Sequence, residues 1–126
     1  MDADVVITAA SFGPVNQVMT DDWLTPHALV VPVDYATYCS ASIAHDASLF
    51  VVDEIGQFLA ARAAGLFAGY PDPTTTIGAA ILDATRRPNG GRVVATHLGT
   101  GLADLVFGRA IMRRAIAADL GTVIPR

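Results

Sequence analysis

Asp34 is the residue of this 126-residue chain that is best placed for acid–base chemistry. It directly follows the apolar run Ala28–Val33, which we expect to be a buried strand. An aspartate just past the carboxyl end of a strand can transfer a proton to or from a substrate carbon or nitrogen. It can equally stabilise a turn by bonding to the backbone that follows. From the residues alone, both roles remain open.

His97 lies between an extended segment and the start of a helix. There it can donate a hydrogen bond to a cofactor carboxamide or titrate near neutral pH, or be satisfied by a backbone carbonyl. His45 and Asp46 are adjacent, but there is no second histidine at the i+4 position and no pair of cysteines, so we expect no metal site. No base is evident near Cys39, which we expect to be a small, partly buried hydrophobic residue.

All eight basic residues are arginines, and the sequence contains no lysine. This excludes a lysine Schiff base, or a P-loop lysine on a phosphate, within this chain. No G-x-G-x-x-G turn occurs, and Gly99–Gly101 is a shorter glycine pair. Six of the eight arginines cluster in two places: Arg86, Arg87 and Arg92 at a turn, and Arg109, Arg113 and Arg114 on the last expected helix. On the helix, like charges at i,i+4 are unfavourable unless acidic groups across an interface receive them.

The composition bounds the class of protein. Apolar residues make up 52% of the chain and charged residues 16%, and the mean hydropathy is +0.46, which excludes disorder and indicates surface that another piece covers. A net charge of −4 argues against a nucleic-acid binder. No apolar stretch reaches the ~18 residues of a membrane span, and Met1–Asp4 has no basic character typical of a signal peptide. We therefore expect a soluble, cytoplasmic chain with no internal disulfide.

Hydrophobic patterning predicts short strands alternating with helical or turn segments. Expected strands are Val5–Thr8, Ala28–Val33, Leu49–Val52 and Arg92–Thr96, with helices over Ser40–Ser48, Ile55–Leu66, from Ile77 and over Gly101–Leu120. The residues expected to face the core from the last three helices are Ile55, Phe58, Leu59 and Leu66, then Ile77, Ala80, Ile81 and Ala84, then Leu102, Leu105, Val106, Met112 and Ile116.

These elements predict an α/β fold, a partial Rossmann-like three-layer arrangement of short parallel strands followed by C-terminal helices. We expect a single domain over residues 1–126, with the second half of a Rossmann-type domain at about 1–53 and a C-terminal helical region at about 54–126. Such sheets bind ligands beyond the carboxyl ends of their strands. The loops Ala9–Pro14 and Val33–Ser40 leave the sheet there.

Four segments, in the right order, resemble the ornithine cyclodeaminase / mu-crystallin family. They are Asp2–Ala10, Asp22–Ala28, Leu49–Asp53 and Arg92–Leu105, of which the last is the most specific. The resemblance implies NAD or NADP as cofactor and hydride transfer at the α-carbon of a small amino or imino acid. By position, it implies that Ala10, Val31, Pro32, Val33, His97 and Leu98 face the nicotinamide.

The chain also departs from the family pattern. Asp34 is the candidate for the family's catalytic aspartate, but it comes two positions early, and His97 stands where the family has a serine. The resemblance covers the C-terminal part of such an enzyme, without the first Rossmann half and the N-terminal substrate segment. We therefore expect weak or no dinucleotide binding by the chain alone, and a complementing polypeptide in the full enzyme.

The alternative interpretation is a non-catalytic remnant or oligomerisation module that binds no cofactor. Under both interpretations Val5–Thr8 is expected to be an exposed, hydrophobic edge strand, which is a template for association. We therefore predict a homo-oligomer, such as a dimer, or a complementing polypeptide as partner, with no nucleic acid and no membrane.

Overall fold

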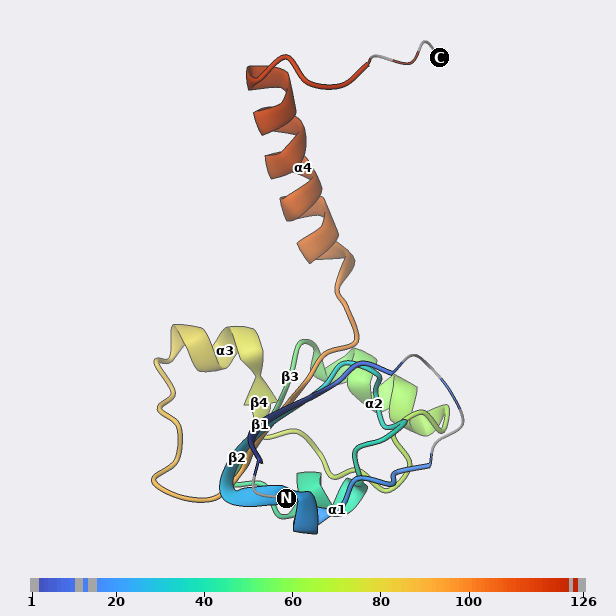
Figure 1. The fold of residues 1–126 in the computed structure, drawn as a ribbon, viewed down its shortest axis with the longest axis vertical. Helices are drawn as coiled ribbons and strands as arrows, with labels where there is room; N and C mark the ends of the chain where they lie inside the picture. The colour runs from blue at the N-terminus through green and yellow to red at the C-terminus, as the bar shows by residue number, and fades with distance from the viewer. Residues whose placement is uncertain (1–2, 11–12, 14–15, 123, 125–126) are drawn as a thin grey trace.

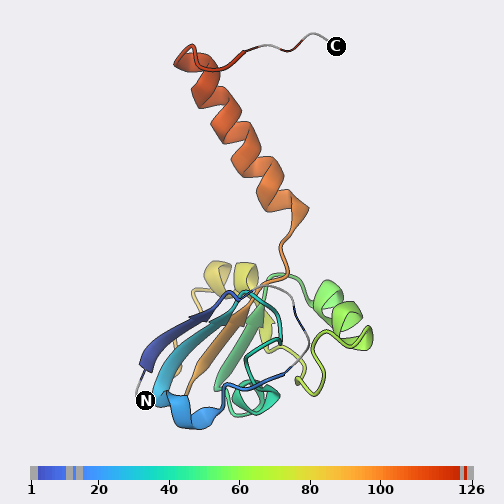
Figure 2. The same cartoon turned by 45° about the vertical axis from the view of Figure 1, so that its right-hand side comes forward.

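The computed structural model describes residues 3–10, 13, 16–122 and 124. Within these residues, five parallel strands form one sheet in the order β1-β2-β5-β3-β4 (Figure 2). The strands are β1 (Ala3–Thr8), β2 (Leu24–Pro32), β3 (Leu49–Val52), β4 (Thr75–Thr76) and β5 (Val93–Thr96). Since β5 lies between β2 and β3, the sheet combines residues from both the 1–53 and the 54–126 segments.

Helices lie on both faces of this sheet. They are the short 3₁₀ helix η1 (Asp21–Trp23), α1 (Ala41–His45), α2 (Ile55–Ala63), α3 (Ile77–Leu82) and α4 (Gly101–Ala117). In Figure 1, α1 and α2 lie on one side of the sheet and α3 on the other, while α4 projects from the end at which the strands finish. The expected three-layer α/β class, with parallel strands and C-terminal helices, is confirmed.

Strand pairing decides which residues face the core. Val6 pairs with Val30, and Val30 with Val94, so these three side chains share the face covered by α1 and α2. Val30 and Val94 are fully buried there. Val5 and Ile7 alternate to the opposite face and are 58% and 64% exposed. As the apolar runs predicted, β1 carries hydrophobic side chains on both faces, which is typical of strands inside a parallel sheet. β1 lies at the edge of the sheet, which confirms the prediction of an exposed, hydrophobic edge strand over Val5–Thr8.

An aromatic cluster fills the space between the sheet and α2. Phe58 of α2 packs against Phe50 of β3 and against Phe67, with ring centroids 5.5 and 4.7 Å apart. Phe67 also contacts Tyr35 and Tyr70, at 5.3 and 5.5 Å. Phe58 and Phe67 are fully buried, so these rings form the centre of the core.

Several residues expected to be buried are not. α2 ends at Ala63, and Gly65 adopts φ +91°, so Leu66 leaves the helical stripe and is 44% exposed while its neighbour Phe67 enters the core. Leu59 of α2 is also at the surface, at 36%. Ile81 of α3 is 73% exposed, because this short helix follows the two-residue strand β4 and reaches little of the sheet.

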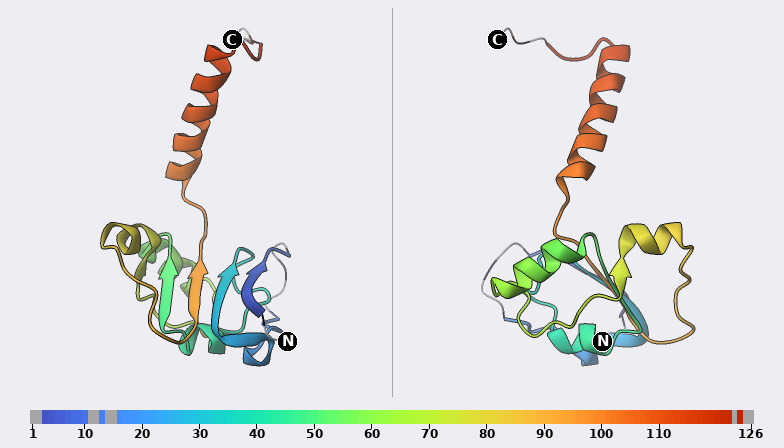
Figure 3. Two further views of the ribbon diagram at one scale, coloured as in Figure 1. Left: turned by 60° about the vertical axis from the view of Figure 1, so that its left-hand side comes forward. Right: turned by 180° about the vertical axis from the view of Figure 1, so that it is seen from behind.

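The predicted inward face of α4 is also wrong. Its apolar side chains are 57–72% exposed, because the helix leaves the sheet instead of packing along it (Figure 3). The residues concerned are Leu102, Leu105, Val106, Met112 and Ile116. The helix also ends at Ala117, before the expected Leu120.

The boundaries of two early elements differ from those expected. β2 begins at Leu24, before the expected Ala28, because Leu24 already pairs with Ala3 ahead of a register shift in β1. Of the expected loop Ala9–Pro14, the residues Ser11, Phe12 and Pro14 lie outside the described residues, as does Asp2 of the first resembling segment.

Candidate functional site

The loops that follow β1, β2 and β5 meet at one end of the sheet. These three strands are neighbours, and Thr8 at the end of β1 is in register with Pro32 at the end of β2. The Val33 amide donates to the Thr8 carbonyl oxygen at 2.8 Å, and the buried Thr96 hydroxyl donates to the Pro32 carbonyl oxygen at 2.8 Å. The three loops therefore begin side by side at the carboxyl ends of parallel strands, where such sheets bind ligands.

The residues expected to face a nicotinamide lie on these strands and loops. Ala10 and His97 are exposed, Val33 and Leu98 are half-buried, and Pro32 is buried. The Tyr35 hydroxyl donates to the Leu98 carbonyl oxygen at 3.3 Å, which joins the loop after β2 to the loop after β5. Val31 pairs with Ile7, so its side chain belongs to the face of the sheet on which α3 lies. The other residues expected to face a nicotinamide lie at the end of the sheet at which the strands finish.

Asp34 binds the end of β1. Its side chain is 2% exposed. One carboxylate oxygen accepts from the Thr8 hydroxyl at 2.5 Å, and the other accepts from the Ala10 amide at 3.2 Å. The turn itself is closed by the main chain, since the Thr37 amide donates to the Asp34 carbonyl oxygen at 3.2 Å. The carboxylate thus ties β1 to the loop after β2, and direct contact with a substrate would require the Thr8 hydroxyl or the Ala10 amide to move away.

Asp53 has the same anchoring role at the end of β3, a role that the sequence did not reveal. Its Oδ2 accepts from the Leu98 and Gly99 amides at 3.0 and 2.9 Å. Its Oδ1 accepts from the Glu54 amide at 3.0 Å. The sequence signal that could have indicated this role is the position of Asp53, which directly follows an expected strand just as Asp34 does. Each aspartate anchors the loop of the neighbouring strand.

The remaining candidates have structural partners or stand apart. The His45 ring nitrogen Nε2 lies 2.8 Å from the Gly69 carbonyl oxygen, which ties α1 to the loop after α2. Among the described residues, no three His, Cys, Asp or Glu side chains are grouped so that they could hold a metal ion. Cys39, expected to be partly buried, is fully buried, and the Tyr70 hydroxyl donates to its carbonyl oxygen at 2.8 Å.

The buried Cys39 thiol predicts a loss of stability at alkaline pH. Burial, with a smaller contribution from the charges of Asp34 and Asp21, raises the pKa of Cys39 from 9.0 to about 11, against an opposing effect of the Tyr70 hydroxyl. The unfolded chain then releases this proton at lower pH than the folded chain, so stability is intact below about pH 9 and declines towards pH 11, by roughly 2–3 kcal/mol.

Urea unfolding between pH 8 and 10.5 measures this decline. In Cys39→Ala, the part of the alkaline decline in stability that comes from the thiol should disappear. The part that comes from Tyr70 should remain, because burial also raises the pKa of Tyr70. Equal alkaline declines in the two proteins would contradict the assignment.

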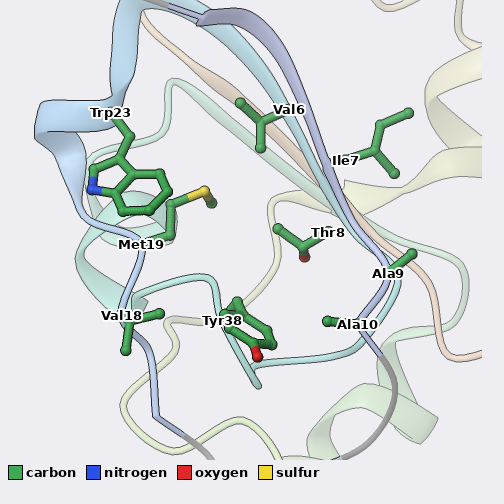
Figure 4. A pocket seen from close by; sticks show the side chains of 9 residues that line it. All are labelled: Val6, Ile7, Thr8, Ala9, Ala10, Val18, Met19, Trp23 and Tyr38. Atoms are coloured by element: carbon green, nitrogen blue, oxygen red, sulfur yellow. The ribbon is translucent and has the colours of Figure 1, made fainter. Parts of the chain in front are cut away.

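A second feature lies beside β1. An apolar hollow of about 320 Å³ is lined by side chains of β1 and the two residues after it, of η1 and the segment before it, and of the loop after β2 (Figure 4). We call it the β1 hollow; its lining residues are Val6, Ile7, Thr8, Ala9, Ala10, Val18, Met19, Trp23 and Tyr38. It reaches the site through Thr8 and Ala10, which Asp34 holds.

The sheet and its helices define an α/β protein with a partial Rossmann-like fold. Among solved structures, the crystal structure of CmnK shares this fold with a TM-score of 0.79 and 21% sequence identity. The alignment covers 97% of this chain and 38% of CmnK, so the chain spans well under half of that protein's length. No protein-family model and no curated protein matches the sequence. In the described residues of the chain, no helix has both the length and the apolar character needed to cross a membrane.

Proposed function

We propose that this chain forms the nicotinamide-facing portion of an NAD(P)-dependent enzyme of the ornithine cyclodeaminase type, acting on a small amino or imino acid by hydride transfer at the α-carbon. The observation that carries the proposal is the convergence of the loops after β1, β2 and β5 at one end of a parallel sheet. The residues that resemble the family's nicotinamide contacts lie on those strands and loops.

The residues at this end of the sheet fit the nicotinamide portion of the cofactor. Val33 and Leu98 offer half-buried apolar side chains, and Ala10 offers a small exposed one, which together suit contact with the flat face of a ring. The described residues contain no glycine-rich turn that would hold a pyrophosphate. When bound, the cofactor would supply the hydride chemistry, and the chain's apolar side chains would orient the ring and exclude water from it.

Asp34 is the residue proposed to move the proton in this reaction. Because its carboxylate is buried, it would act through the Thr8 hydroxyl, which donates to it at 2.5 Å and also lines the β1 hollow. The Thr8 hydroxyl would give its proton to the Asp34 carboxylate as its oxygen takes a proton from the substrate amine, so that Asp34 ends protonated. Asp53 would position Leu98 beside the ring, because its carboxylate accepts a hydrogen bond from the Leu98 amide.

Methyl NMR of the intact chain, titrated with NADH and NADPH, tests the proposal. We expect weak but saturable binding, with a Kd on the order of 1 mM because the phosphate site lies elsewhere. The shifts should be confined to the methyl groups of Ala10, Val33 and Leu98. Adenosine diphosphate, which lacks nicotinamide, should leave these methyl groups unchanged.

Two variants sharpen the test. Leu98→Asp should abolish the shifts, whereas Ile81→Asp, at an exposed position on α3, should retain them. An absence of shifts up to saturating solubility of the cofactor would overturn the proposal. It would favour the second candidate, an oligomerisation module, which the exposed apolar side chains of β1 and α4 support.

A further inference from the structure

The chain has two asparagines, and they lie in different settings. Asn16 precedes Gln17 in the segment before η1, and Asn89 precedes Gly90 between α3 and β5. Asparagine is among the chemically labile residues of proteins, because the backbone nitrogen of the following residue can attack its side-chain amide. Whether this attack takes place depends on the following residue and on how freely the backbone there can turn.

The loop around Asn89 has the freedom that the attack needs. Residues 85–92 form neither helix nor strand, and they run around the outside of the sheet from α3 to β5 (Figure 1). Asn89 is exposed, and Gly90 and Gly91 adopt φ +125° and +77°, a region that other residues rarely enter. A Cβ placed on Gly90 would have no atom of the described residues within 4 Å apart from its chain neighbours, so there is open space beside this peptide bond.

The hydrogen bonds at the two asparagines differ in the same direction. The Gly90 amide donates to the Pro88 carbonyl oxygen at 2.8 Å, a bond that closes a three-residue turn. Moving the Gly90 nitrogen therefore disrupts one local turn. The Gln17 amide instead donates to the Thr37 carbonyl oxygen at 3.0 Å. Attack on Asn16 would break this bond between two distant segments of the chain.

Two arginines in the same loop favour the reacting form of the Gly90 amide. The nitrogen attacks as it loses its proton, so negative charge develops on it while the new bond forms. Arg86 and Arg87 lie three and two residues before Asn89, and both are exposed. A nearby positive charge favours an anionic group, by a modest amount where water and salt screen the charges.

We propose that Asn89 is a site of spontaneous deamidation, which converts it mainly to isoaspartate. The Gly90 nitrogen bonds to the side-chain carbonyl carbon of Asn89, and the bond from that carbon to Nδ2 breaks. The side-chain nitrogen leaves as ammonia, together with the proton of the Gly90 amide. Water then opens the resulting five-membered imide ring and leaves a carboxylate, whose proton passes to the ammonia. The overall change consumes water and involves no oxidation or reduction.

The product alters a loop whose far end is fixed. Isoaspartate carries the main chain through the side chain, which adds a carbon atom between residues 89 and 90. Gly91 packs so closely on Ser48 that a Cβ there would lie 1.7 Å from the Ser48 hydroxyl oxygen, and the Ser48 amide donates to the Arg92 carbonyl oxygen at 2.9 Å. We expect the added atom to strain this contact and loosen the start of β5 at Val93.

Incubation of the intact chain in mildly alkaline buffer, followed by peptide mass spectrometry, tests the site. We expect a species one charge more negative than the −4 of the fresh chain, with an equal amount of ammonia released. The change should map to Asn89, with Asn16 unaltered. Asn89→Gln, whose longer side chain would have to close a six-membered ring, should stay unconverted over the same time. An aged chain with Asn89 intact, or equal conversion of Asn16, would overturn the proposal.

Amide hydrogen exchange at Ser48 tests the effect on the fold. Exchange should be about tenfold faster in the purified isoaspartate form than in the fresh chain. Asn89→Asp is the matched control, because it has the same added charge without the extra backbone atom, and it should exchange as the fresh chain does. Faster exchange in Asn89→Asp as well would assign the loosening to charge, and equal rates in all three would show that the loop absorbs the added atom. Either result would overturn the proposed effect on β5. Neither measurement depends on cofactor binding.

Discussion

Phe67→Ala is expected to lower the free energy of unfolding by about 3–5 kcal/mol, a large fraction of the stability of a domain of this size. The ring is fully buried and packs against Tyr35, Phe58 and Tyr70. Its removal leaves a cavity in the centre of the core. Because Tyr35 also bonds to Leu98, we expect the loops at the end of the sheet to loosen as well.

Urea denaturation gives this value directly, and the neighbouring residue provides the control. Leu66 is 44% exposed, so Leu66→Ala should cost less than about 1 kcal/mol even though the two residues are adjacent and both hydrophobic. Similar losses for the two variants would mean that Phe67 is not the central packing residue that its contacts indicate.

Phe67 also shows why helical periodicity misjudged some of the core. A period of 3.6 residues, continued past Ala63, selects Leu66 as buried. Gly65 interrupts this helical periodicity, because its positive φ changes the direction of the chain. As a result, the side chain of Phe67, two residues further on, points into the core. A glycine commonly ends a helix, but the direction in which the chain continues after it depends on tertiary packing.

The strands were more predictable, because their signal is local. The apolar runs at Val5–Thr8 and Leu49–Val52 form strands within one sheet, and they are apolar because the sheet is parallel. β4 was missed because Thr75–Thr76 is two residues long and looks like a helix cap. Thr76 is in fact also the N-terminal cap of α3, since its hydroxyl accepts from the Ala79 amide at 3.0 Å.

The helix α4 illustrates a different limit. Its existence followed from a long apolar and periodic segment, but its burial could not, since a sequence pattern says which residues need a partner and not where that partner lies. The same applies to the site. Asp34 stood out as an aspartate after a strand, whereas the equivalent anchoring role of Asp53 depends on which strand lies next to β3, and that neighbour, β5, comes much later in the chain.

Asp34→Ala is expected to lower the free energy of unfolding by about 2–4 kcal/mol, because the Thr8 hydroxyl and the Ala10 amide both lose a charged acceptor in a buried setting. The end of β1 should open first, so amide hydrogen exchange at Ala10 and Val33 should accelerate more than exchange in β3. Unchanged stability would show that the carboxylate does not hold β1.

Asp34→Asn separates this anchoring role from proton transfer. An asparagine can accept from the Ala10 amide through its oxygen and donate to the Thr8 hydroxyl oxygen through its nitrogen, so both contacts persist with neutral partners. The cost should fall to about 1 kcal/mol, since hydrogen bonds to a charged group are roughly twice as strong as neutral ones. Thr8→Val should show coupling with Asp34 of about 1–2 kcal/mol in a double-mutant cycle. If asparagine is as damaging as alanine, the charge itself holds the end of β1. If asparagine keeps the fold but abolishes turnover in the completed enzyme, Asp34 carries the proton as well as the structure.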